Sequence, residues 1–213
     1  ERERGARVDR DLPTFCSAPP AMSYTLYYHS ECKAFYGRAW APLAMLKHTG
    51  KNFEVKGVEA APADAGFACP FMTFPGGYSI AQTGTIIEVV GAQCGLAPGN
   101  EAEDAKAKQL VSDAADLFGE LSSKPDQRLM KWLTYLESNI KDNGYFCSSG
   151  LSYADFGMYM TIGVIAMKKA VGKLEGVELP PKLEKWYSVT MAAIPAVKEM
   201  TDSGIPILPP SMV

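Results

Sequence analysis

The chain has 213 residues, of which 47% are hydrophobic and 21% charged, and its formal net charge is -3. This composition is typical of a globular protein whose length allows a sizeable core, in one large domain or two small ones. The small negative charge argues against a nucleic-acid or anionic-membrane partner, and no apolar run approaches the roughly 20 residues of a membrane-spanning helix.

The cysteine and histidine content limits the chemistry that we expect. The five cysteines are odd in number and lack metal-ligand spacing, so we expect free thiols in a reducing compartment and no metal. They are Cys16, Cys32, Cys69, Cys94 and Cys147. The only histidines are His29 and His48, which is a poor supply for a histidine metal site or a Ser-His-Asp triad.

Residues 1–22 are expected to form an extended or disordered leader, because charges and prolines follow one another there without a hydrophobic period. Met22 and Ser23 look like a natural start placed inside the chain. The arginines of the leader suit the remnant of a targeting segment, whereas its acidic residues do not, so an artificial extension is the alternative.

The next segment predicts a strand, helix, strand unit. The run Tyr24–Tyr28 is rich in β-forming residues and predicts a strand. Apolar residues at helical spacing predict a helix at about residues 35–48, and a second strand is predicted at Asn52–Val58. A unit of this length implies a parallel pair of strands with a right-handed crossover. Residues 60–66 are small and weakly patterned, which suggests one loose helical turn.

Residues 67–87 carry the densest set of signals, and we interpret them as strand, tight turn, strand and helix start. Pro70 heads the first strand, where a proline is tolerated, and Gly76-Gly77 supplies the turn. Gln82 and Thr83 then lie at the N-terminus of an apolar helix that runs to about residue 93. Free N–H groups and the helix dipole make such a terminus suitable for a carboxylate.

After a linker at residues 95–100, the pattern is helical throughout. Broad apolar faces predict helices at about 101–121, from near 125 to about 143, at 152–170, from 181, and a short last one after 195. Ser152 and Asp155 form a capping-box pattern at the start of an almost wholly apolar helix. Residues 205–213 are expected to form an extended tail.

These motifs, taken together, resemble the cytosolic-type glutathione S-transferases, specifically the tyrosine-class, sigma-like members. The resemblance rests on Cys69-Pro70, Gln82-Thr83, the strand YTLYY, Gly37-Arg38-Ala39 and the pair Ser152 and Asp155. It implies an α/β thioredoxin-like domain of order β-α-β-α-β-β-α at residues 23–94. An all-α helical domain at residues 101–204 would follow it.

The resemblance also implies a glutathione site with no metal. Gln82 and Thr83 would hold the γ-glutamyl end, and the Cys69 backbone, set by a cis bond to Pro70, would pair with the cysteinyl amide. A small apolar electrophile would lie against the helices at 101–121 and 152–170.

Three residues near the end of the first strand could stabilise or replace the glutathione thiolate: Tyr28, Ser30 and Cys32. We favour Tyr28, because the strand and the Gly-Arg-Ala sequence match the tyrosine classes, although about four extra residues separate them here. Cys32 is the next candidate, because a thiol at a helix N-terminus can have a lowered pKa. Arg38 is expected to assist electrostatically.

One part of the family pattern is missing. The tyrosine classes hold the glycine carboxylate of glutathione with Trp, Lys and Gln or Lys side chains, whereas this chain has Ala68 two residues before Pro70. Lys56 and Lys47 are possible substitutes from other positions.

The sequence therefore leads to three functional hypotheses. The first is a glutathione transferase that activates the glutathione thiolate for conjugation to, or peroxide reduction of, a small apolar electrophile, in detoxification. The alternative is a non-catalytic protein of this fold that acts as a binding or assembly subunit, and the third is a Cys-dependent thiol transferase. The resemblance implies a homodimer in the cytoplasm, or in an organelle such as the plastid if residues 1–21 are a targeting remnant.

Overall fold

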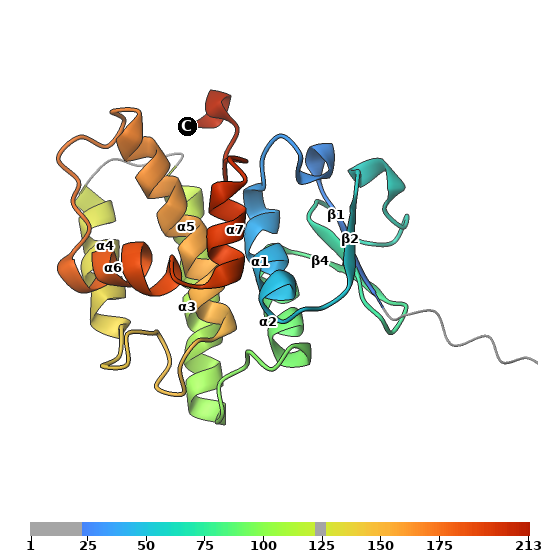
Figure 1. The fold of residues 1–213 in the computed structure, drawn as a ribbon, viewed down its shortest axis with the longest axis horizontal. Coiled ribbons are helices and arrows are strands. Elements are labelled where there is room, and N and C mark those ends of the chain that lie inside the picture. The colour runs from blue at the N-terminus through green and yellow to red at the C-terminus, as the bar shows by residue number, and fades with distance from the viewer. Residues whose placement is uncertain (1–22, 122–126) are drawn as a thin grey trace, which may run out of the picture.

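The computed structural model describes residues 23–121 and 127–213. It has two parts side by side, a small sheet with two helices and a larger bundle of helices (Figure 1). The predicted leader at 1–22 and Pro125, near which a helix was expected to begin, lie outside the described residues.

The sheet has four strands in the order β2-β1-β3-β4. They are β1 (Tyr24–Tyr27), β2 (Phe53–Lys56), β3 (Phe71–Thr73) and β4 (Ser79–Ala81). β1 is parallel to β2 and antiparallel to β3, and β3 is antiparallel to β4. The parallel pair is joined through a helix, as the strand, helix, strand pattern predicts.

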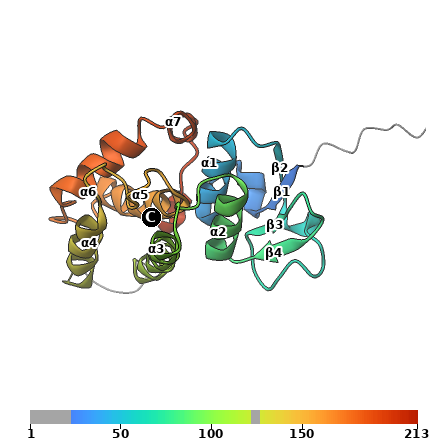
Figure 2. The ribbon, with the colours of Figure 1, turned by 90° about the horizontal axis from the view of Figure 1, so that it is seen from below.

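Helices α1 (Trp40–His48) and α2 (Thr83–Gln93) lie between the sheet and the helical bundle (Figure 2). All residues of α1 from Trp40 to Leu46 are buried, because one side of the helix faces the sheet and the other faces the bundle. The sheet and the bundle are thus built on a shared layer of two helices.

The bundle contains the helices α3 (Glu101–Glu120), α4 (Gln127–Asn139), α5 (Tyr153–Ala170), α6 (Pro181–Lys185) and α7 (Pro195–Asp202). A π-helical turn at Trp186–Met191 continues α6. α5 is the central helix, and every residue from Tyr153 to Ile165 is buried, as expected for a helix that is apolar on all sides.

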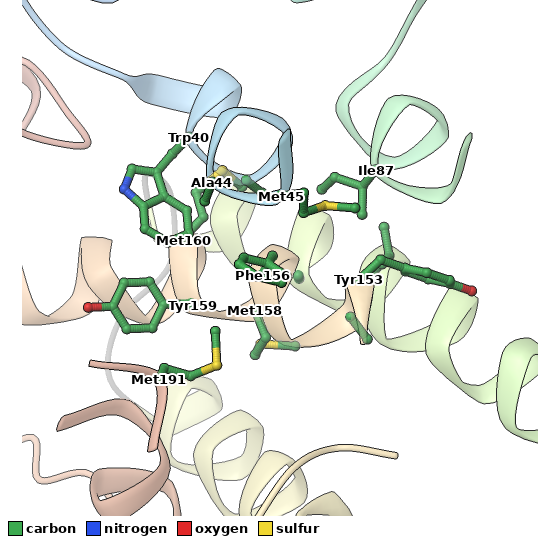
Figure 3. Close-up of a cluster of buried hydrophobic side chains, with 14 of the residues drawn as sticks. Trp40, Ala44, Met45, Ile87, Tyr153, Phe156, Met158, Tyr159, Met160 and Met191 are labelled. Atoms are coloured by element: carbon green, nitrogen blue, oxygen red, sulfur yellow. The ribbon is translucent and has the colours of Figure 1, made fainter. Parts of the chain in front are cut away.

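Large side chains from α1, α2 and α5 interlock where the two parts meet (Figure 3). The Trp40 and Tyr159 rings stack with centroids 4.8 Å apart. Gly91 of α2 lies so close to Tyr153 that an added Cβ would come within 2.5 Å of the ring. α2 therefore packs directly on α5 at this point, and a residue larger than glycine would not fit at position 91.

The last residues pack against the loop that precedes α1. The Tyr36 N–H donates to the Pro206 carbonyl at 2.9 Å, and the Gly37 N–H donates to the Ile207 carbonyl at 2.6 Å. Ile207 also fills the space beside Gly163 of α5. The expected tail is therefore fixed to both parts of the fold.

Three sequence predictions of element bounds need correction. The first helix was expected from about Phe35, but α1 begins at Trp40 after a 3-10 turn at Gly37–Ala39. The loose helical turn expected at residues 60–66, which is the second helix of the predicted order, is a 3-10 turn at Val58–Ala60 instead. α4 ends at Asn139, before the predicted end near residue 143, and turns follow it.

Candidate functional site

Strand pairing brings three of the predicted site residues to one edge of the sheet. The register places Tyr27, Phe71 and Ala81 in one row across β1, β3 and β4. The next residues beyond that row are Tyr28, Pro70 and Gln82. They are far apart in the sequence, so their meeting is a property of the fold.

Tyr28 is held in place by the loop before α1. Its side chain is buried, and its hydroxyl oxygen accepts a hydrogen bond from the Arg38 backbone N–H at 3.0 Å. Gly37 has a φ of +51°, and a Cβ there would come within 2.2 Å of the Tyr28 hydroxyl. Only glycine therefore allows this close approach without strain.

Burial raises the pKa of Tyr28, while the hydrogen bond from the Arg38 N–H and the Arg38 charge act in the opposite direction. The phenol therefore keeps its proton at neutral pH. Because the Arg38 N–H occupies one lone pair of the oxygen, the O–H remains able to donate to a ligand atom.

The two alternative residues lie in the extra loop. Ser30, Glu31 and Cys32 have φ values of 46°, 52° and 57°, a left-handed turn that non-glycine residues rarely adopt. Ser30 is exposed, and its Oγ accepts weakly from the Ala34 N–H at 3.4 Å. This turn accommodates the additional residues between β1 and Gly37.

The expectation of a lowered Cys32 pKa is wrong. Because α1 begins only at Trp40, Cys32 does not lie at its N-terminus. Cys32 is buried, and burial raises the pKa of its thiol to about 12. A thiol in this environment is a poor nucleophile at neutral pH.

The guanidinium of Arg38 lies over the Phe118 ring of α3, 5.1 Å from its centroid. Its charge lowers the pKa of both Tyr28 and Cys69, against the raising effect of burial. Arg38 thus acts electrostatically on two groups at this edge of the sheet, and its assistance to catalysis stays a prediction.

The N-terminus of α2 has two unusual features. Gln82, its N-cap, has a φ of 72° and is exposed, and its side chain makes no capping hydrogen bond. The Thr83 Oγ1 is buried and has no hydrogen-bond partner within the part of the chain that the structure describes. A buried hydroxyl without a partner is uncommon and needs an explanation.

Cys69 precedes a cis bond to Pro70, as the resemblance implied. Its sulfur lies 3.1 Å from the Nε2 of His29, a contact that the sequence analysis did not foresee. The sequence did contain one signal for this contact, because His29 directly follows Tyr28, which was expected at the same edge of the sheet as Cys69.

Comparison with known proteins identifies the architecture. The family described as glutathione S-transferase, C-terminal domain, matches residues 120–204. A glutathione S-transferase from Ascaris lumbricoides is similar in structure, with a TM-score of 0.69 and 19% identity over 88% of this chain and 99% of that one. The chain has the glutathione S-transferase fold.

Other solved structures share this fold at similarly low identity. Monomeric Na-GST-3 from Necator americanus has a TM-score of 0.67 and 17% identity, covering 85% of this chain and 97% of its own. Prostaglandin synthase D of Nilaparvata lugens has a TM-score of 0.63 and 19% identity, covering 84% and 97%. No curated protein sequence matches the chain.

The glutathione S-transferase fold expected from the sequence is therefore confirmed, and residues 120–204 match the model of the C-terminal domain of that family. The sigma-like subclass stays a prediction. In glutathione S-transferase terms, β1 to β4 with α1 and α2 form the thioredoxin-like part, and α3 to α7 form the helical part.

The capping box of this glutathione S-transferase fold is present at the start of α5. The Asp155 carboxylate accepts hydrogen bonds from the Ser152 N–H at 2.9 Å, the Phe146 N–H at 3.2 Å and the Trp186 indole N–H at 3.1 Å. The Ser152 hydroxyl donates to it as well, at 2.9 Å. Burial raises the pKa of Asp155, and the donors oppose this effect by favouring the charged form.

The possible substitutes for the missing carboxylate clamp are engaged elsewhere. Lys47 pairs with Glu199 of α7 at 2.5 Å, and Lys56 pairs with Glu54 at 2.8 Å. Ala68 is exposed and offers no polar group. A glutathione glycine carboxylate would therefore lack the contacts typical of the tyrosine classes.

Besides a cavity of about 720 Å³ beside α2, the start of α3 and Tyr153, which no predicted site residue lines, two cavities border the helices expected to face an electrophile. One of about 20 Å³ borders Arg38, Thr83 and residues of α3 and α5, and is too small for such a molecule. The other, about 560 Å³, lies between α3 and α4, and its lining includes Trp132 and Tyr135 but no predicted site residue.

The described residues contain neither a metal-binding cluster nor a membrane-spanning helix. No group of three or more His, Cys, Asp or Glu side chains there could hold a metal ion. No helix there is long and apolar enough to cross a membrane.

Proposed function

We propose that this protein is a glutathione transferase in which Tyr28 stabilises the glutathione thiolate. The observation that carries the proposal is the common edge of the sheet, where Tyr28, the cis Cys69-Pro70 bond and the start of α2 follow the paired ends of β1, β3 and β4. Glutathione is a tripeptide with a thiol at its centre and a carboxylate at each end, and its thiol, its cysteinyl amide and its γ-glutamyl carboxylate would each meet one of these three features.

The chemistry follows from the pKa of the substrate thiol. A free thiol has a pKa near 8.5, so it is mostly protonated and weakly nucleophilic at neutral pH. A hydrogen bond from the Tyr28 O–H to the sulfur favours the thiolate, because the bond is stronger to the charged form. The raised pKa of Tyr28 keeps this donor protonated, and Arg38 adds a positive charge nearby.

The γ-glutamyl carboxylate would bind at the N-terminus of α2. The first N–H groups of this 11-residue helix and its dipole favour an anion. The unpartnered Thr83 Oγ1 would gain a hydrogen-bond partner when the carboxylate binds. The conjugated electrophile would lie toward α3 and α5.

This assignment predicts opposite effects of Thr83→Val on binding and on stability. Affinity for reduced glutathione, measured by calorimetric titration at pH 7, should fall about 10-fold or more, because a hydrogen bond to a charged group is lost. The free energy of unfolding should stay constant or rise, because an unpaired buried hydroxyl is removed. Thr85→Val, on the exposed side of the same helix, is the matched control and should change neither.

The titration of the wild-type protein also tests the proposal as a whole. Binding in the micromolar to low-millimolar range is expected. Absence of heat up to about 10 mM, which means binding weaker than about -3 kcal/mol, would overturn the transferase assignment.

The second candidate is a non-catalytic binding or assembly subunit of this fold. The observation that favours it is the absent carboxylate clamp, since Ala68 is apolar and Lys47 and Lys56 are paired with acidic residues. Glutathione binding without turnover of any small electrophile would support this candidate over the first.

The same proposal includes a homodimer. It also places the protein in the cytoplasm, or in an organelle if residues 1–21 are a targeting remnant. Phe67 is fully exposed, so contact with a second copy would remove its ring from water. Sedimentation is expected to give twice the chain mass of 23.1 kDa. A mass of one chain at micromolar concentration would contradict the dimer, and a structurally similar protein, Na-GST-3, is itself described as monomeric.

A further inference from the structure

The extra loop, in which this chain departs from the family pattern, contacts the residue before the cis proline. The extra loop after β1 begins with His29, and the residue before the cis proline is Cys69. The Cys69 Sγ lies 3.1 Å from the His29 Nε2, within hydrogen-bond distance for a sulfur atom. A thiol and an imidazole at this distance are the arrangement of a nucleophile and its general base.

The imidazole is oriented by aromatic neighbours. The Phe35 ring stacks on it at a centroid distance of 6.3 Å and an interplanar angle of 27°. The Tyr28 ring packs edge-on against it at 5.2 Å and 61°. These two contacts fix the plane of the ring and direct its Nε2 at the sulfur.

Both partners can be reached from solvent. His29 is exposed and Cys69 is half-buried, in contrast to the buried Cys32. A small disulfide can therefore approach the Cys69 sulfur, whereas the Cys32 sulfur is covered.

The surroundings keep the Cys69 thiol protonated at neutral pH. Burial raises its pKa, and the hydrogen bond from its own backbone N–H and the Arg38 charge only partly offset this effect. The other described titratable or charged groups of this neighbourhood are His29, Tyr28, Cys32, Glu31 and Lys33, of which Glu31 and Lys33 pair with each other at 2.5 Å. Because Tyr28 and Cys32 also stay neutral, His29 is the group positioned to take the proton.

We propose that Cys69 and His29 form a nucleophile and base pair that exchanges thiols with a small disulfide of the glutathione type. The Cys69 thiol transfers its proton to the His29 Nε2, and the thiolate attacks one sulfur of the disulfide. The new bond joins Cys69 to one half of the disulfide, the old sulfur–sulfur bond breaks, and its electron pair leaves with the other half as a thiolate. That thiolate takes the proton from His29, so no further oxidant or reductant is required.

The identity of the disulfide rests on the proposed function. If glutathione binds at the sheet edge, its sulfur lies near both the Tyr28 hydroxyl and the Cys69 sulfur. Tyr28 would then stabilise the departing glutathione thiolate. The third hypothesis of the sequence analysis, a thiol transferase that depends on Cys32, is therefore replaced by one that depends on Cys69.

The test uses two disulfides, glutathione disulfide and 2-hydroxyethyl disulfide, with the adduct located by mass spectrometry of peptides. The expected adduct is on Cys69, and Cys69→Ser should lose it. Cys94→Ser, a half-buried cysteine at the end of α2, is the matched control and should keep it. An adduct found on any other cysteine instead of Cys69 would overturn the proposal.

The role of His29 is tested by the pH dependence of adduct formation. His29→Gln should slow the reaction about 10-fold or more at pH 7, because the base is lost. The difference should narrow only at pH values above the ordinary thiol pKa of about 8.5, because burial raises the pKa of Cys69 and the thiol ionises without help only as the pH approaches that raised value. His48→Gln is the matched control for the other histidine, and equal rates for His29→Gln and the wild type at pH 7 would refute the pair.

The two disulfides separate this proposal from the transferase function. Reaction of Cys69 with 2-hydroxyethyl disulfide in a His29-dependent manner upholds the pair even if calorimetry detects no glutathione binding. Glutathione binding without an adduct from either disulfide overturns the pair and leaves the transferase function intact.

Discussion

Replacement of Tyr28 by Phe is expected to lower kcat/KM for conjugation of glutathione to a small apolar electrophile by about 10²- to 10³-fold, the effect of removing one preorganised donor. The variant keeps the ring but loses the O–H that would donate to the glutathione sulfur. It also leaves the Arg38 N–H without its acceptor, since that N–H donates to the Tyr28 oxygen at 3.0 Å.

The pH dependence distinguishes loss of the donor from simple loss of structure. Without the Tyr28 O–H, the bound glutathione thiol should ionise at a higher pH, so the rate should keep rising toward a pKa of about 8.5. In the wild type the rate should level off at a lower pH, because the donor favours the thiolate.

Tyr27→Phe is the matched control. Tyr27 is the preceding residue of β1 and is also buried, but its hydroxyl makes only a long contact with Thr73 Oγ1, at 3.5 Å. We expect nearly unchanged kinetics for this variant. Equal turnover for Tyr28→Phe and Tyr27→Phe would show that Tyr28 is not the thiolate donor.

Replacement of Asp155 by Ala is expected to lower the free energy of unfolding by about 3–5 kcal/mol, comparable to breaking a buried charged contact. The carboxylate is fully buried and accepts from the Ser152 N–H and hydroxyl, the Phe146 N–H and the Trp186 indole. Removing it leaves several buried donors without an acceptor at the start of the central helix.

Denaturant unfolding measures this loss, and Ser152→Ala provides a graded comparison. Ser152→Ala removes the contacts of one hydroxyl, with Asp155 and with the Cys147 thiol, and should cost about 0.5–2 kcal/mol. Asp116→Ala, on the exposed face of α3, is the control and should change stability by less than about 0.5 kcal/mol. A loss for Asp155→Ala no larger than that for Ser152→Ala would show that the bonds to Phe146 and Trp186 add nothing.

Features coded by local patterns could be predicted from the sequence. The capping box at Ser152 and Asp155, the turn between β3 and β4, and the apolar helix α5 follow from side-chain spacing and backbone preference within a few residues. The cis bond before Pro70 was predicted through the family resemblance and is present.

The loop between β1 and α1 could not be predicted in the same way. Ser, Glu and Cys do not favour positive φ, so no local preference indicates the left-handed turn at residues 30–32. The Tyr28 hydroxyl packs against Gly37, and the Gly37 N–H donates to the Ile207 carbonyl, so tertiary contacts hold this segment and override the local preference. Because of the same contacts, α1 begins at Trp40 and not at the predicted start near Phe35.

The contact between His29 and Cys69 was missed for a related reason. It depends on the register between β1 and β3 and on the path of the extra loop, neither of which hydrophobic spacing reveals. The role of each predicted site residue likewise stays a prediction, since placement at one sheet edge shows proximity and not catalysis.

The attachment of residues 206 and 207 to the loop before α1 has a consequence for biosynthesis. The N–H groups of Tyr36 and Gly37 find their acceptors in carbonyls that are translated almost at the end of the described chain. During synthesis the thioredoxin-like part can fold early, as N-terminal units generally do. The loop that positions Tyr28 gains these two hydrogen bonds only after Pro206 and Ile207 have left the ribosome, so we expect the site to become fully ordered later than the rest of the thioredoxin-like part.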